Sequence, residues 1–175
     1  MPVNPDYWRI VTNRAADYTD ALRNDPGPMA GLHIIQSHAM EYGLARTAHI
    51  AQLCLLVVVD HDAQPDTRTV MGTVDVNRLV PPTADALTIL DNAAALSRTF
   101  AFTPGEAMAA VEEQIAAVGR ARQVVQTILN GAPQGIAGRQ QSIDALWELR
   151  DDPRALCAVL ALTTVALRAV QPLPA

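Results

Sequence analysis

The chain has 175 residues, of which 50% are hydrophobic and only 4% aromatic, and it carries a formal net charge of −5. This negative charge argues against a nucleic-acid partner, because binding to a phosphate backbone needs clustered positive charge. A chain of this length can bury about 70% of its unfolded surface without disulfides or metals. Because alanine is abundant and aromatic residues are few, we expect a single all-α domain over residues 1–175.

Several features point to the cytoplasm and away from a membrane. Cys54 and Cys157 lie in apolar stretches, where a free thiol behaves as a small hydrophobic side chain. The first residues show no basic region followed by an apolar one, so no secretory signal is predicted. The apolar runs 48–59 and 155–167 are shorter than the ~20 residues that span a bilayer. All 13 basic residues are arginine, which is typical of a high-GC bacterium or its phages.

The first predicted helix covers residues 5–23. Asn4 can cap it, and Pro5 suits the first helical position because its missing N–H would be unpaired there anyway. Its apolar stripe consists of Tyr7, Val11, Tyr18 and Leu22. Turn residues and two prolines at 24–28 end it.

One long helix is predicted over residues 31–60, because apolar residues recur there at helical spacing. Met40, Leu44 and the ring of His33 fall on its core side. The last turns are apolar all round, which indicates burial among other elements. A strand over 55–59 remains an alternative, since a short β-branched run looks the same in a buried helix or a strand.

Residues 60–83 are the least helical stretch, and 24 residues is long for a simple connection. Three interpretations stay open. One is a short β-hairpin about Gly72, with strands at 67–71 and 73–79. The others are an ordered lid and a mobile loop.

Two further helices are predicted beyond this insertion, the first over 83–102. The second starts at the capping box 103–106 and ends at Asn130 and Gly131. This second helix carries a heptad seam formed by Met108, Val111, Ile115, Val118, Arg122, Val125 and Leu129. The seam indicates either a central helix within one bundle or an interface between chains.

The C-terminal part is predicted to be a connector followed by two helices. Residues 131–138 are glycine-rich but lack the lysine and Ser/Thr of a phosphate-binding loop. A short helix over 142–150 should bury Trp147. Asp152 as N-cap and Pro153 as first residue start a last helix that should be buried among others. The expected fold is a bundle-like domain of five or six helices.

All four histidines, His33, His38, His49 and His61, lie within one 29-residue window. Histidines beside carboxylates raise the hypothesis of a zinc, iron or manganese site. On one continuous helix, however, His38 and His49 would be about 16 Å apart at 1.5 Å per residue. Ligands that bind one ion at about 2 Å cannot be so distant.

Two smaller groups remain as candidates. His38, Glu41 and Tyr42 are neighbours at i+3 and i+4 and, with His49, are the catalytic candidates.

The second group is Asp60, His61 and Asp62, which are the candidate metal ligands. In the alternative interpretation, His61 only stabilises the negative end of a helix dipole.

We therefore expect a non-catalytic helical interaction or regulatory protein that binds a second copy of itself or another protein through the heptad seam or the last helix. No cofactor is predicted. The alternative is a small metal-dependent enzyme or ligand-binding protein. Its pocket would be lined by His38, Glu41, Tyr42, Arg46 and His49, with His61 nearby.

Overall fold

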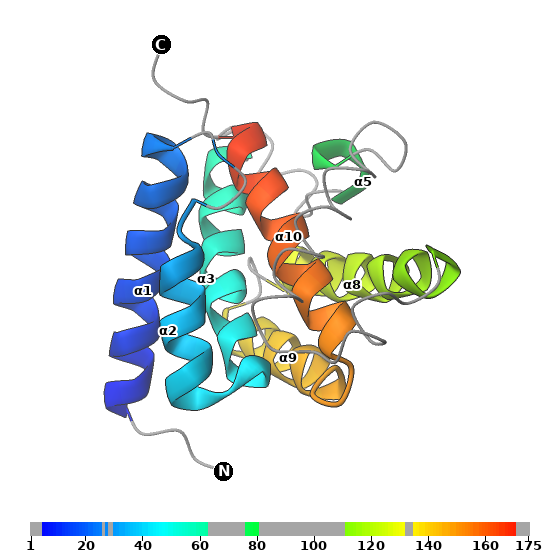
Figure 1. Cartoon of the computed structure of the whole chain (residues 1–175), viewed down its shortest axis with the longest axis horizontal. Coiled ribbons are helices and arrows are strands. Elements are labelled where there is room, and N and C mark those ends of the chain that lie inside the picture. Colours follow the sequence, from blue (N-terminus) through cyan, green and yellow to red (C-terminus); the bar gives the residue numbers. More distant parts are fainter. Residues whose placement is uncertain are drawn as a thin grey trace.

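The structure is a computed structural model that describes residues 5–25, 27, 30–62, 76–80, 111–131 and 135–170. It describes the backbone alone, without side chains, for residues 44, 57–62, 78–79, 111, 114, 135 and 169–170. Across these ranges the regular structure is helical, with no strand (Figure 1). The all-α prediction is therefore confirmed for this part of the chain.

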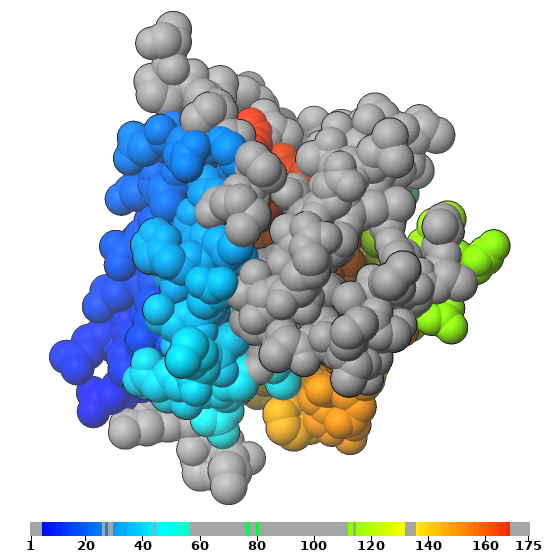
Figure 2. Space-filling model, in the orientation of Figure 1, coloured from blue at the N-terminus to red at the C-terminus, as the bar shows by residue number. Residues whose placement is uncertain are grey.

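The helices pack around α3 and α10. Their bounds are α1 (Pro5–Asn24), α2 (Leu32–Tyr42), α3 (Leu44–Asp62), α5 (Val76–Leu79), α8 (Val111–Gly131), α9 (Gly135–Glu148) and α10 (Pro153–Val170). Helix α3 contacts α1, α2 and α10, while α8 packs between α9 and α10. Figure 1 shows α1, α2 and α3 side by side, with α8 running across α10. The atoms of α1 and α2 form one layer on the face that Figure 2 shows.

Helix α10 forms the centre of the core. Every side chain from Ala155 to Leu162 is buried, which confirms the prediction that the last helix lies among others. Its two buried hydroxyls are satisfied within the helix, because Thr163 and Thr164 donate to the carbonyls four residues earlier. Within the described ranges, no helix is both long and apolar enough to cross a membrane.

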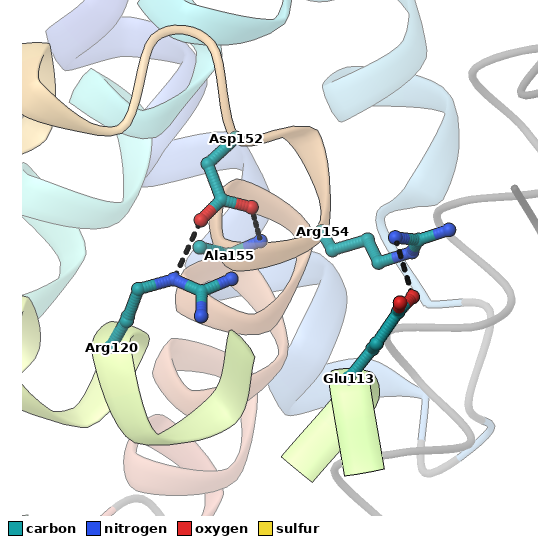
Figure 3. A network of polar contacts seen from close by, with 5 residues as sticks. All are labelled: Glu113, Arg120, Asp152, Arg154 and Ala155. Carbon is teal, nitrogen blue, oxygen red and sulfur yellow. Dashed lines mark hydrogen bonds and ion pairs between the residues drawn. The ribbon is translucent and has the colours of Figure 1, made fainter. Parts of the chain in front are cut away.

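The start of α10 confirms the predicted cap and ties the helix to α8 (Figure 3). Asp152 accepts a hydrogen bond from the Ala155 N–H at 3.2 Å, and its other carboxylate oxygen lies 2.7 Å from Arg120 Nε. A second ion pair joins Arg154 to Glu113 at 3.3 Å. Partly exposed pairs contribute less than about 1 kcal/mol each, so they mainly orient the two helices.

The prediction of one long helix over 31–60 is wrong, because Gly43 divides it into α2 and α3. Gly43 has φ 89° and ψ 160°, a backbone region that only glycine enters readily. Its N–H bonds to the Ala39 carbonyl and closes α2, while its own carbonyl accepts from Thr47 in α3. The strand alternative over 55–59 is also wrong, since α3 continues to Asp62.

Two core assignments fail in α2. Met40 is 90% exposed and His33 is exposed, although the sequence pattern placed both inside. Both assignments assumed that the helical phase of the later residues 44–58 continues backwards through Gly43. The break resets this phase, so the inward side of α2 carries Ile35 and His38 instead.

Residues 131–138 are not an extended connector, because α9 already begins at Gly135. Gly131 and Gly138 bring the backbones of α8 and α9 into direct contact. A Cβ on Gly131 would lie 2.8 Å from the Gly138 carbonyl oxygen, and one on Gly138 would overlap the Gly131 carbonyl. Trp147 is 57% exposed, so its predicted burial is wrong.

The predicted β-hairpin is not supported. Its second strand, over 73–79, overlaps α5, which is helical from Val76 to Leu79. This short helix is held on α8, since Gln126 accepts from the Val76 N–H at 2.8 Å and Arg122 donates to the Val80 carbonyl at 2.6 Å. The other strand at 67–71, the helix over 83–102 and the capping box at 103–106 lie outside the described residues.

Substitution of Gly138 tests the close approach of α8 and α9. Gly138→Ala should destabilise the protein by about 3 kcal/mol, because its methyl group would overlap backbone rather than a movable side chain. Gly119→Ala is the matched control: no atom lies within 4 Å of its new Cβ, so it should stabilise α8 by about 1 kcal/mol. Urea unfolding measures both. Equal effects would contradict the Gly131–Gly138 contact.

Candidate functional site

Polar side chains from α1, α2 and α3 meet at the hydroxyl of Tyr7. Its oxygen lies 2.8 Å from His49 Nδ1, 3.2 Å from His38 Nε2 and 3.2 Å from the Arg46 carbonyl oxygen. The three side chains are buried, with exposed fractions of 5% for Tyr7, 9% for His49 and 0% for His38. A buried polar group is stable only when it is hydrogen-bonded, and each of these rings has such a partner.

Arg14 and Glu41 connect this centre to solvent. The Arg14 guanidinium donates to His38 Nδ1 at 2.8 Å and to the Glu41 carboxylate at 2.7 Å. The side chain of Arg14 is 23% exposed and that of Glu41 is 51% exposed. A continuous chain of hydrogen bonds therefore runs from the surface carboxylate to His49.

Aromatic rings and a further arginine surround these bonds. Ring centroids are 5.0 Å apart for Trp8 and His49, 4.8 Å for His38 and Tyr42, and 5.0 Å for Tyr7 and Tyr42. The Arg46 guanidinium lies 5.9 Å from the centre of the Tyr7 ring. We call the whole set the Tyr7 cluster: Tyr7, Trp8, Arg14, His38, Glu41, Tyr42, Arg46 and His49.

The local sequence explains why these groups meet. On α1, Tyr7 and Arg14 are seven residues apart and so lie on the same side of the helix, in line with buried Val11. The turn at Gly43 folds α3 back beside α2 and brings His38 and His49 to the same hydroxyl. The separation of about 16 Å expected for these histidines was wrong, because it assumed one continuous helix.

Burial keeps both histidines of the cluster neutral. It lowers the pKa of His38 from 6.5 to about 4, and the nearby Arg14 charge lowers it further while Glu41 opposes this. Burial likewise lowers the pKa of His49 to about 4, assisted by His38 and Arg46. The Arg14 hydrogen bond lowers the pKa of Glu41. The cluster at neutral pH thus holds uncharged rings with charges only at its edges.

The structure brings together the four catalytic candidates His38, Glu41, Tyr42 and His49, along with Arg46. His33 lies elsewhere, on the exposed side of α2.

The candidate metal ligands Asp60, His61 and Asp62 belong to the last turn of α3, but their side chains lie outside the described residues. Among the side chains that are described, no three histidines, cysteines or carboxylates are grouped as a metal ion would need.

The cysteine Cys54 is not a nucleophile candidate, because burial raises the pKa of its thiol to about 12.

The residues of the heptad seam have different surroundings. Val125 and Leu129 are fully buried inside the chain itself, whereas Ile115 is 58% exposed and Val118 is partly buried. The remaining seam positions are Arg122, which bonds to the Val80 carbonyl, and Met108 and Val111, whose side chains lie outside the described residues.

Sequence reasoning missed Tyr7, Trp8 and Arg14 as members of the site. Tyr7 was assigned to the core stripe, which is correct for its ring but overlooks its hydroxyl, a group that needs a partner when buried. Arg14 on the same side of the helix as Tyr7 is the signal that could have indicated a polar contact there. Gly43 between the two histidines is the second signal.

Acid should destabilise the fold through these histidines. Their folded pKa of about 4 lies below the usual 6.5, so the unfolded chain binds more protons between these pH values. Their stabilising effect is therefore complete above about pH 6.5 and is lost as the pH falls through about 4. Urea unfolding at several pH values between 7 and 4 gives the free energy of unfolding as a function of pH. The slope of this function should be smaller in His38→Gln than in the original chain by roughly 1 kcal/mol per pH unit. An equal slope would contradict this burial, and His33→Gln, on the exposed side of α2, is the control.

Comparison of the chain with protein-family models, with curated proteins and with solved structures found no match in any of the three.

Proposed function

We propose that the chain is a non-catalytic helical interaction or regulatory protein that associates with a second copy of itself through the first half of α8. The observation that carries this proposal is the exposure of Ile115. This side chain is 58% exposed, although it belongs to the same apolar seam as Val125 and Leu129, which are fully buried. The seam thus passes from the core of one chain onto its surface.

A second copy is the proposed partner, because the seam recurs along α8 at the 3, 4 spacing by which two like helices pair. The last helix, the other interface expected from the sequence, is mostly buried in its own chain and is left out of the proposal.

A cytoplasmic location belongs to the same proposal. Cys54 and Cys157 are both buried, and Cys54 is a free thiol. Such cysteines are compatible with a reducing compartment, where disulfides are rare.

Substitution of Ile115 tests the proposed interface. Light scattering after size exclusion should show a dimer or larger oligomer for the original chain, and Ile115→Asp should shift it to monomer. A charge at the centre of an apolar contact costs several kcal/mol when it has no partner. Ala116→Asp is the matched control, since Ala116 is the exposed neighbour on the same helix and lies off the seam.

The control should keep the oligomer, and circular dichroism should show equal helix content in both variants. A monomer at high micromolar concentration of the original chain would overturn the proposal. Loss of the oligomer in both aspartate variants would also overturn the role of the seam.

A second candidate function is a small metal-dependent enzyme or ligand-binding protein that uses the Tyr7 cluster. One observation favours it: two imidazoles, a phenol and a carboxylate converge within one chain of hydrogen bonds. Perturbed titratable groups that meet in this way are enriched at functional sites. A ligand would have to replace the hydrogen bonds that these groups now make to one another.

Metal analysis of the purified protein distinguishes the two functions. The interaction protein should contain no stoichiometric transition metal, and its content should not change in His38→Gln. A metal bound at one equivalent and lost in His38→Gln or His61→Gln would favour the enzyme. His33→Gln is the control, because His33 lies outside the Tyr7 cluster.

A further inference from the structure

The hydrogen bonds of the Tyr7 cluster have defined directions, beginning at Arg14. Arginine can only donate, so His38 Nδ1, which lies 2.8 Å from the guanidinium, must be the acceptor. A neutral imidazole carries one N–H, and the proton of His38 is therefore on Nε2. This nitrogen lies 3.2 Å from the Tyr7 oxygen, to which it donates.

The single proton of the Tyr7 hydroxyl has two acceptors to choose from. His49 Nδ1 lies at 2.8 Å and the Arg46 carbonyl oxygen at 3.2 Å. A neutral His49 can accept this proton on Nδ1 and carry its own on Nε2, or carry its own on Nδ1 and leave the hydroxyl proton on the Arg46 carbonyl oxygen. The shorter contact favours the first arrangement, in which all donors in the chain Arg14, His38, Tyr7 and His49 point the same way.

Addition of a proton has different consequences at the two histidines. On His49 it occupies Nδ1, which now donates to Tyr7, while the hydroxyl proton turns to the Arg46 carbonyl. The phenol oxygen then accepts two hydrogen bonds and donates one, so no contact is lost. On His38 the proton would occupy the nitrogen that faces Arg14, where two positively charged donors oppose each other.

We propose that the Tyr7 cluster is an acid-responsive switch with two steps. His49 takes up the first proton while the Tyr7 hydroxyl turns to the Arg46 carbonyl, and a second proton on His38 breaks the hydrogen bond from Arg14, which is one of the contacts between α1 and α2. Both protons come from solvent, and only hydrogen bonds are exchanged.

The direct contact of the Arg14 guanidinium with His38 Nδ1 is the observation that sets this order. Trp8 on α1 lies 5.0 Å from the His49 ring and attracts its charged form, as the Tyr42 ring on α2 does for His38. Glu41 on α2 favours a charged His38, whereas Arg46 on α3 and a charged His38 each oppose the charge on His49. The inference does not depend on self-association.

Long-range ¹H–¹⁵N spectra of the full chain test the switch, because they report which ring nitrogen carries the proton. At pH 7, both His38 and His49 should carry it on Nε2. On acidification, His49 should gain its Nδ1 proton before His38 gains a second proton. Circular dichroism at the same pH should show the helices intact, and the exposed His33 serves as an internal reference.

Arg14→Met removes the guanidinium group that keeps the proton of His38 on Nε2. In this variant His38 should show a mixture of both proton positions at pH 7 and should charge at higher pH than in the original chain. Arg9→Met is the matched control, since Arg9 is an arginine of the same helix that pairs with Asp6 at the surface and does not belong to the Tyr7 cluster.

Four results would overturn the proposal: a proton on Nδ1 of His38 at pH 7, a proton on Nδ1 of His49 at pH 7, protonation of His38 before His49, or uptake of both protons only as the helices unfold. Identical spectra of the cluster in Arg14→Met and Arg9→Met would overturn it as well.

Discussion

The backbone at Gly43 is the constraint on which the arrangement of the N-terminal half depends. With φ 89° and ψ 160°, this one residue interrupts a helix that would otherwise run straight through residues 31–60. The interruption turns α3 back beside α2, and both then pack on α1. Without it, His38 and His49 would lie far apart along one axis, and Tyr7 could bond to only one of them.

The rest of the fold depends on small residues and capped ends rather than on large side chains. Gly131 and Gly138 let α8 and α9 touch along their backbones, and a run of small and aliphatic residues lets α10 lie at the centre. Asp152 then fixes where α10 begins and anchors it to α8 through Arg120. A chain with few aromatic residues can thus form a dense core because its helices approach closely.

Local signals in the sequence were sufficient where one short pattern decides the structure. The adjacent residues Asn4 and Pro5 in the sequence, and likewise Asp152 and Pro153, correctly predicted that α1 begins at Pro5 and α10 at Pro153. Hydrophobic period also identified the buried stripe of α1. These features involve neighbours within a few residues, so no knowledge of the tertiary structure is needed to recognise them.

Long-range geometry was beyond the same reasoning. A glycine inside a helical pattern is usually tolerated at a cost of about 1 kcal/mol, so Gly43 did not by itself indicate a turn. Once that turn was missed, the phase of α2 was wrong, and Met40 and His33 were placed in the core. The candidates His38, Glu41, Tyr42 and His49 were singled out, but Tyr7, which joins the two histidines, lies on another helix.

The chemistry of the Tyr7 cluster is hard to explain by stability alone. An apolar core at this place would avoid the desolvation of two imidazoles and one hydroxyl, and apolar replacements of buried polar networks are often neutral or stabilising. The hydrogen bond from Arg14 to His38 exists only while His38 is neutral, because a charged His38 would carry a proton on the nitrogen that faces the guanidinium. The hydrogen bonding of the cluster therefore depends on the protonation state of its histidines, whereas the packing of an apolar core would not change with pH. That dependence is the property by which buried histidines act as pH sensors.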